Sequence, residues 1–429
     1  MRKLTRLLAD ITPLRESPQF RRLWTGSMLS AVGGGLTWFA VPLQVYSITR
    51  SPFAVGLIGL AQMVPTLLIG VLGGAVADSV DRRKLVLVMS CALAAVSAAL
   101  AAQALAGLRL VWLLYLLVAV QSALSAINQP ARQTFIRTLL NREQLAAGLA
   151  LNRLSFQVTL IGAPALAGLI AAVPGLGLRA CYALDAISYA ASIYGVARLP
   201  AMPPQSVSRP GLRVIAAGIG YIGRTKVLVG AFLADLNATI FGLPVSLFPA
   251  INAERFSGDP RTLGLFMTAI GIGGLVSAMF SGPIRHVARQ GRAMLVTVAV
   301  WGAAFAGFAL ASSLWLTLTL LAVAGAADSF TVVFRGTIVQ ASTPEELRGR
   351  VTAADYVVGA GGGQLGNLEA GALGSLTSPV ISALSGGLVT IAGAAVIGLA
   401  LPAFFRYRTD CREDEPVGTP EAETATTPV

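Results

Sequence analysis

Carboxylates occur inside segments of this sequence that are otherwise apolar, where an ionised side chain is costly. They are Asp185, Asp235, Asp328, Asp355 and Glu369. A charged side chain at the centre of a bilayer costs about 2.5–3.5 kcal/mol on insertion scales. Because burial favours the neutral form of a carboxyl group, such residues are suited to bind and release protons. The chemistry that these residues predict is reversible proton binding inside a membrane.

Other polar and aromatic residues in the apolar segments each allow a functional and a structural interpretation. Arg153 either reaches the nearby interface or contacts an acid or an anionic substrate, and Gln44 either faces a cavity or bonds to another helix. Asp328 precedes Arg335 by two helical turns on one face, so the two side chains form either a functional site or an intrahelical pair. Three aromatic residues either line a cavity or pack against helices and lipid: Trp38, Phe241 and Phe334.

Composition places these residues in a membrane protein. Of the 429 residues, 55% are hydrophobic and only 12% are charged, and the mean hydropathy is +0.72. Soluble domains usually carry about 25% charged residues. The only histidine is His286 and the three cysteines are scattered, so no metal site or disulfide is expected, and no phosphate-binding loop or nucleophile elbow is present. We therefore expect no enzyme and no cofactor.

Twelve segments are long and apolar enough to cross a bilayer, which needs about 20 residues. They are residues 22–47, 53–77, 84–106, 110–131, 145–172, 180–198, 227–250, 262–284, 293–312, 314–338, 350–375 and 379–404. Most of the basic residues lie in the termini and alternate loops. This distribution places both termini in the cytoplasm and explains the net charge of +12 without nucleic acid.

A proline-rich and basic linker divides the twelve segments into two sets of six. The motif ARQTFI at 131–136 recurs as FRGTIV at 334–339, which supports two related halves. The predicted organisation has a cytoplasmic segment, an N-terminal bundle, a central loop with a short amphipathic helix at 211–223, a C-terminal bundle and a disordered acidic tail. These parts are residues 1–21, 22–198, 199–226, 227–404 and 405–429.

A short charged cassette, GAVADSVDRRK at 74–84, joins the second and third predicted helices. Further motifs are SPQFR at 17–21, FAVPLQ at 39–44, QPARQ at 129–133, TPEELRGR at 343–350 and LGNLEAG at 365–371. The cassette resembles the loop signature of the major facilitator superfamily, and the whole pattern is similar to its siderophore and multidrug exporters. Ser79 and Asp81 depart from the usual cassette, and alanines replace two glycines of the efflux motif at 162–168.

The resemblance implies an all-α membrane protein of twelve helices in two pseudo-symmetric six-helix bundles. It also implies that the cassette is a gate, formed by Gly74, Asp78, Asp81, Arg82 and Arg83. Asp78 would contact the start of the eleventh helix, and the two arginines would pair with Asp78 or Asp81. The alternative for these charges is a plain cytoplasmic anchor.

In that superfamily the first, fourth, seventh and tenth helices line the cavity, so Asp235 and Asp328 rank first as proton or substrate sites, with Glu369 next. Asp185 is expected to hold a structural hydrogen bond, and Asp355 to be solvated. We expect a monomeric transporter in the bacterial inner membrane that exports a small amphipathic compound, a siderophore or a drug, by proton antiport. An importer of the same fold and a non-transporting receptor or assembly partner stay open.

Overall fold

A computed structural model describes residues 10–202, 212–280, 282 and 287–408, but not the side chains of residues 70–79, 212–215 and 360. The described part is helical and contains no strand. Its first helices are α1 (Thr12–Glu16), α2 (Pro18–Thr49), α3 (Pro52–Ser79), α4 (Arg82–Leu105), α5 (Val111–Leu139), α6 (Arg142–Ala171), α7 (Gly177–Ala197) and α8 (Leu212–Arg224). They are followed by α9 (Lys226–Phe241), the 3-10 turn η1 (Val245–Leu247), α10 (Phe248–Arg255), α11 (Pro260–Met279), α12 (Gln290–Leu310), α13 (Leu314–Ala341), α14 (Glu345–Leu376), α15 (Pro379–Ala400) and α16 (Pro402–Phe405).

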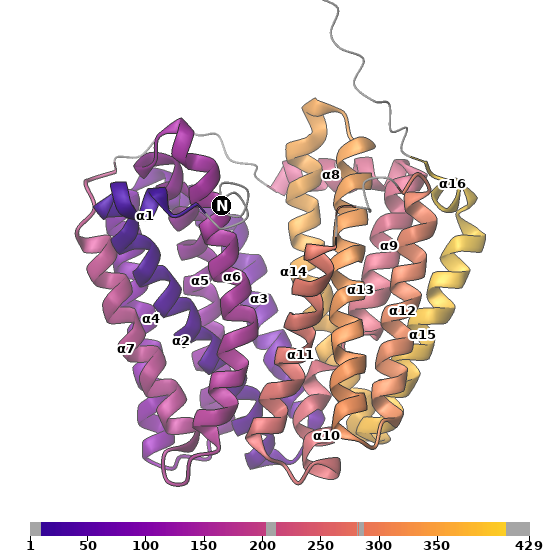
Figure 1. The fold of residues 1–429 in the computed structure, drawn as a ribbon, viewed down its shortest axis with the longest axis horizontal. Helices are drawn as coiled ribbons and strands as arrows, with labels where there is room; N and C mark the ends of the chain where they lie inside the picture. Colours follow the sequence, from indigo (N-terminus) through magenta and orange to yellow (C-terminus); the bar gives the residue numbers. More distant parts are fainter. Residues whose placement is uncertain (1–9, 203–211, 281, 283–286, 409–429) are drawn as a thin grey trace, which may run out of the picture.

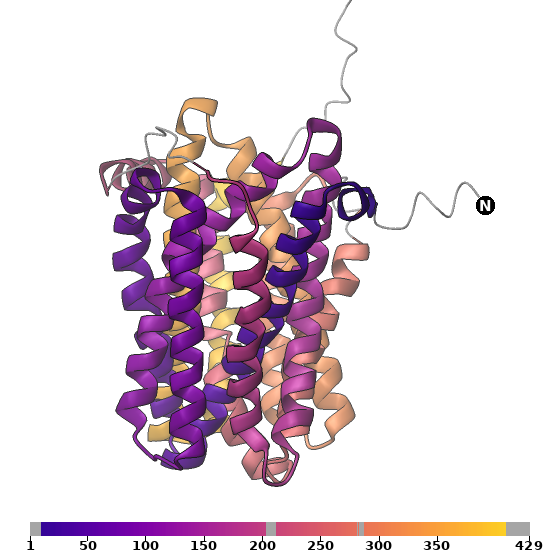
Figure 2. The same ribbon diagram turned by 90° about the vertical axis from the view of Figure 1, so that its left-hand side faces the viewer.

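Ten helical stretches of the described chain are long and apolar enough to cross a membrane. Two more predicted spans, α7 and α14, fall outside that set, because polar residues such as Asp185 in α7 and Asn367 and Glu369 in α14 lower their mean hydropathy. Both nevertheless run alongside the other long helices in the two views (Figures 1 and 2). The all-α membrane fold is confirmed, and the arrangement is consistent with twelve spans.

The seventh predicted span is not one continuous helix. It is interrupted between α9 and α10, where Gly242 ends α9 and Pro244 lacks an N–H for the helical ladder. The indole of Trp301 donates to the carbonyl of Gly242 at 2.6 Å, and the side chain of Asn367 accepts from Ser246 N at 3.1 Å. Backbone groups freed inside a membrane need such partners, so the neighbouring helices stabilise the break.

The helices form two groups that lie side by side (Figure 1). The N-terminal group comprises α1–α7 and the C-terminal group α8–α16. Helix α7 packs against α2 and α4, while α12 packs against α13 and α15. Helices α1, α8 and α16 lie at one end of the molecule, so both ends of the described chain are on one side.

Two helix pairs hold the groups together, α3 with α14 and α6 with α11. Glycines allow these backbones to approach closely: a Cβ at Gly371 would lie 2.6 Å from the carbonyl oxygen of Pro52, and one at Gly168 would lie 2.7 Å from that of Pro260. Gln364 also donates to Gln62 at 3.0 Å across the first pair. These contacts use the start of α3 and the end of α14, which lie away from the end that carries α1, α8 and α16.

The amphipathic helix expected in the central loop is present as α8. Gly218 faces the backbone of Arg350 at the start of α14, and the hydroxyl of Tyr221 donates to the carbonyl of Ser342 at 3.1 Å. Helix α8 therefore packs on the C-terminal group at the end that carries both termini (Figure 1).

Candidate functional site

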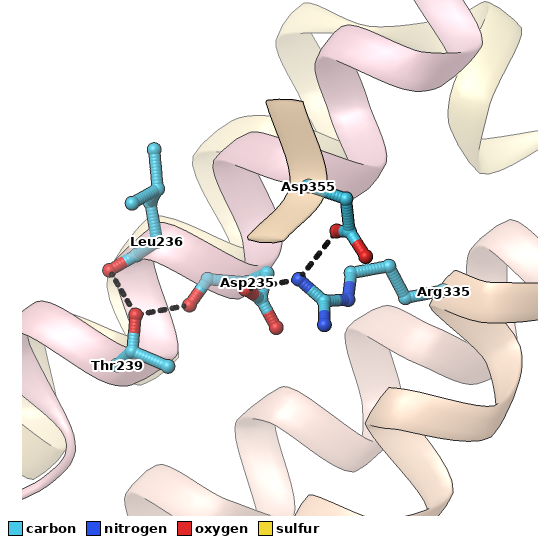
Figure 3. A network of polar contacts seen from close by, with 5 residues as sticks. All are labelled: Asp235, Leu236, Thr239, Arg335 and Asp355. Carbon is cyan, nitrogen blue, oxygen red and sulfur yellow. Dashed lines mark hydrogen bonds and ion pairs between the residues drawn. The ribbon is translucent and has the colours of Figure 1, made fainter. Parts of the chain in front are cut away.

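A partly buried arginine joins three helices of the C-terminal group through ion pairs (Figure 3). Nη1 of Arg335 on α13 lies 2.8 Å from Oδ2 of Asp235 on α9 and 3.0 Å from Oδ1 of Asp355 on α14. The side chains of Asp235 and Arg335 are 8% and 14% exposed, whereas that of Asp355 is 31% exposed. We call these three residues the arginine bridge.

The helices around the bridge are positioned by apolar packing. Ala231, Ala234 and Ala238 on α9 pack in one cluster with Ile338 on α13. Small residues on α9 bring its backbone near α13, which places Asp235 within reach of Arg335. Thr239 donates to the carbonyl of Asp235 at 2.9 Å within α9, so its hydroxyl is satisfied locally and does not contact the carboxylate (Figure 3).

The pairing differs from what the sequence suggested. Arg335 contacts Asp235 and Asp355 on other helices, and no ion pair joins it to Asp328 in the described structure. Asp355, which was expected to be solvated, has a side chain that is 31% exposed and also pairs with Arg335. Helix crossing places these residues together, and single-helix spacing cannot reveal that.

Asp328 is the third carboxylate of this region. It is partly buried on α13, two turns before Arg335. Among ion pairs between described residues, none includes Asp328. The region therefore contains three carboxylates and one guanidinium, and it carries a net charge of −2 when all are ionised. Two protons, or one proton and one cationic group of a substrate, would balance that charge.

The remaining proton and substrate candidates lie apart from the arginine bridge. Glu369 is partly buried in the second half of α14. Arg153 is exposed on α6, with its guanidinium carbon 5.5 Å from the ring centre of Phe156. No acid contacts Arg153 among the described ion pairs, so the structure favours its interfacial reading over neutralisation of a buried carboxylate.

Gln44 is buried and fully engaged in the N-terminal group. It exchanges hydrogen bonds with the amide of Gln103 on α4, at 3.1 and 3.0 Å, and accepts from the hydroxyl of Tyr182 on α7 at 2.7 Å. These bonds join three helices, so the structural alternative for Gln44 describes it better than the cavity reading.

The aromatic candidates fall into two kinds. Trp38 is 47% exposed and Phe241 is 36% exposed, so both are available to lipid or to a ligand. Phe334 is 5% exposed and packs with Met294, Val298 and neighbouring residues inside the C-terminal group. Phe334 is therefore a core residue, which agrees with helix packing, the alternative to a place on a cavity wall.

The charged cassette is tied to its own half of the molecule. Asp81 is the N-cap of α4 and accepts from the backbone N–H groups of Arg83 and Lys84 at 2.8 and 3.2 Å. Arg83 donates to the carbonyl of Ala197 at the end of α7 at 2.6 Å, and Arg82 is buried. The predicted gate residues Gly74 and Asp78 have side chains outside the described part. Asp81 is thus a helix cap, and Arg83 holds α7 instead of pairing with Asp81.

A second, partly buried arginine was not identified from the sequence, although its motif was noticed. Arg132 occupies the place in the first ARQTFI repeat that Arg335 occupies in the second. Its guanidinium donates to the hydroxyls of Ser27, Ser90 and Ser192, and in the described structure it has no carboxylate partner. The repeated motif therefore has the arginine in both halves, but the acidic partners only in the C-terminal half. This difference between the two halves was the signal in the sequence that could have identified Arg132.

Comparison with known proteins agrees with this architecture. The sequence profile of the transmembrane secretion effector family matches residues 8–424. The enterobactin exporter EntS of Shigella dysenteriae is 26% identical over 398 residues, which cover 92% of this chain and 93% of that protein. EntS of an Escherichia coli strain is 26% identical over 405 residues, with 94% and 96% covered.

Solved structures show the same fold at low identity. The nucleoside transporter NupG has a TM-score of 0.74 at 14% identity, with 91% of this chain and 100% of that chain covered. A bacterial homologue of the iron transporter ferroportin, in an inward-facing state, has a TM-score of 0.67 at 17% identity, with 90% and 98% covered.

Proposed function

We propose a function from the premise that the chain belongs to the transmembrane secretion effector family, within the major facilitator superfamily. It is a multi-pass membrane transporter for small molecules and not an enzyme. Beyond this, we propose that it exports a small amphipathic compound, a siderophore or a drug, from the cytoplasm across the bacterial inner membrane. The similarity to enterobactin exporters supports the direction and the substrate class.

The proposed energy source is the proton gradient, and one observation carries this part of the proposal. Asp235 and Asp355 contact the guanidinium of Arg335, and Asp328 lies close enough to interact with Arg335 electrostatically. Carboxylates in excess of the cation, away from bulk water, favour uptake of a proton or of a cationic group. Protonation of one acid would weaken its hold on Arg335 and alter the contacts among α9, α13 and α14. This links proton binding to the relative positions of helices that move in alternating access.

The contacts between the two helix groups indicate the conformation in which the protein would bind its substrate. The groups meet through the start of α3 and the end of α14, far from the end that carries α1 and α16. With both termini in the cytoplasm, as the positive-inside rule predicts, this arrangement is closed to the outside and ready to load substrate from the cytoplasm.

Transport in inverted and right-side-out vesicles tests this function. With an imposed pH gradient and a panel of siderophores and drugs, we expect uptake into inverted vesicles that collapses with the gradient. Asp235→Asn and Asp328→Asn are expected to abolish accumulation, while Glu346→Gln, an exposed carboxylate at the start of α14, is the matched control. Saturable flux that ignores the gradient would contradict proton antiport. Gradient-driven flux in the opposite direction would indicate an importer, and no flux in either orientation would favour a receptor.

A further inference from the structure

A second carboxyl group is buried in the N-terminal group, away from the arginine bridge. Asp185 on α7 is 0% exposed. Thr37 on α2 donates to its Oδ2 at 2.6 Å, and Ser97 on α4 lies 2.8 Å from the same atom. The other oxygen, Oδ1, has no hydrogen-bond partner in the described structure. The expected hydrogen bond of Asp185 is present, but it satisfies only one of the two oxygens.

Among the described residues, no cation forms an ion pair with this carboxyl group. Helix α2 presents Gly33 and Thr37 to it, and α4 presents Ser97. Tyr189, one turn along α7, interacts with it electrostatically, and Arg132 on α5 interacts in turn with Tyr189. Arg132 is held by serine hydroxyls of three helices and forms no ion pair with Asp185 in the described structure.

The energetics favour the neutral acid at this position. Removing an ionised carboxylate from water into a protein interior is unfavourable, and a buried oxygen without a hydrogen bond adds to that cost. A protonated carboxyl group removes the charge. Hydroxyl groups can both donate and accept, so Thr37 and Ser97 fit either form of the acid. The geometry thus describes a site that stores a proton without a counter-charge.

A glycine triplet in α2 covers this site. Gly33 faces Oδ1 of Asp185, and a Cβ there would lie 2.9 Å from that atom. A Cβ at Gly35 would clash with Ala163 on α6. Gly34 differs, since a Cβ would meet nothing within 4 Å. A glycine destabilises a helix relative to alanine, and close packing explains its presence at Gly33 and Gly35 but not at Gly34. A run of glycines also marks a place where a helix bends.

We propose that Asp185 is a proton-binding site of the N-terminal group, neutral in this conformation, and that bending of α2 at the glycine triplet opens it to proton exchange. Its use in transport rests on the proposed proton antiport, whereas proton binding at Asp185 does not. The site complements the arginine bridge: one half pairs two of its acids with a cation, and the other holds a single acid with hydroxyl groups.

Infrared difference spectroscopy of the purified full-length protein tests the proton itself. The wild-type protein is expected to show the carbonyl stretching band of a buried protonated carboxylic acid at neutral pH, and Asp185→Asn is expected to lose that band. Asparagine resembles the neutral acid in shape, so the variant should keep the wild-type thermal stability. An identical band in wild-type and variant protein, or none in either, overturns the assignment.

Transport tests the use of the site. In vesicles, Asp185→Asn is expected to retain exchange down a substrate gradient but to lose accumulation driven by a pH gradient. Gly34→Ala, which fits sterically, is expected to keep the infrared band and slow gradient-driven transport, with wild-type rates overturning the bending step. Accumulation driven by a sodium gradient at constant pH, and lost in Asp185→Asn, overturns the choice of the proton. If wild-type protein shows no pH-driven flux but the band is present, the proposed function fails and the proton site stands.

Discussion

Substitutions in the arginine bridge should destabilise the protein in a defined order, and Arg335→Met is the strongest of them. At 2.8 Å and an effective dielectric constant near 20, the attraction between Arg335 and Asp235 is about 6 kcal/mol before desolvation is subtracted. Removing one partner of a buried pair costs about 3–5 kcal/mol, because the other charge is left without compensation. We expect a loss in this range for Arg335→Met.

The two acids should differ because their exposure differs. The side chain of Asp355 is 31% exposed, so Asp355→Asn should cost no more than about 1 kcal/mol, as for a surface ion pair. Asp235→Asn should cost about 1–3 kcal/mol, since Asp235 is buried but Arg335 keeps Asp355 as its partner. Combining Arg335→Met with Asp235→Leu removes both buried charges and should recover stability relative to Arg335→Met alone.

Equilibrium unfolding of the purified variants in mixed detergent micelles measures these differences, provided that each variant unfolds in one cooperative step. The free energies of the wild-type protein, Arg335→Met, Asp235→Leu and the double variant form a double-mutant cycle. We expect a favourable coupling energy between Arg335 and Asp235. If the losses of the two single variants simply add in the double variant, the bridge does not stabilise the C-terminal group and the charge argument fails.

Three further predictions concern the cassette and the contacts between helices. Asp81→Asn should leave transport and stability near wild type, because asparagine caps helices as well as aspartate does. Asp78→Asn should lower transport in correctly inserted protein. An equal loss of transport in vesicles for the two variants would mean that Asp81 is more than a cap. Gly371→Val should separate α3 from α14, since even a Cβ would lie 2.6 Å from a backbone oxygen. A cysteine introduced at Ser375 in a cysteine-free background should then react faster with an impermeant thiol reagent. An unchanged labelling rate would contradict the close contact. Gln103→Leu should destabilise the N-terminal group by about 1–3 kcal/mol in thermal unfolding, because it leaves the buried amide of Gln44 with fewer partners, and a neutral result would show that the pair is dispensable.

Much of the architecture was predictable from the sequence because it depends on local composition. Runs of about 20 apolar residues must form helices that cross a bilayer, and basic residues in alternate loops orient them. The break between α9 and α10 was missed although Gly242 and Pro244 were visible. Its stability depends on Trp301 and Asn367, which come from other helices.

The candidate site was predictable only in part. The sequence by itself determined that acids such as Asp235, Asp328 and Asp185 lie in apolar helices, because the residues around each acid are visible in it. The composition of those segments also makes an ionised carboxylate there costly. Only the tertiary structure decided that Asp235 shares Arg335 with Asp355, and that Asp185 has hydroxyl partners instead of a cation. The physical reason is that periodicity gives the face of a helix on which a residue lies, but the crossing of helices decides which faces meet. For a buried carboxyl group, that meeting decides whether it is held by an arginine or retains its own proton.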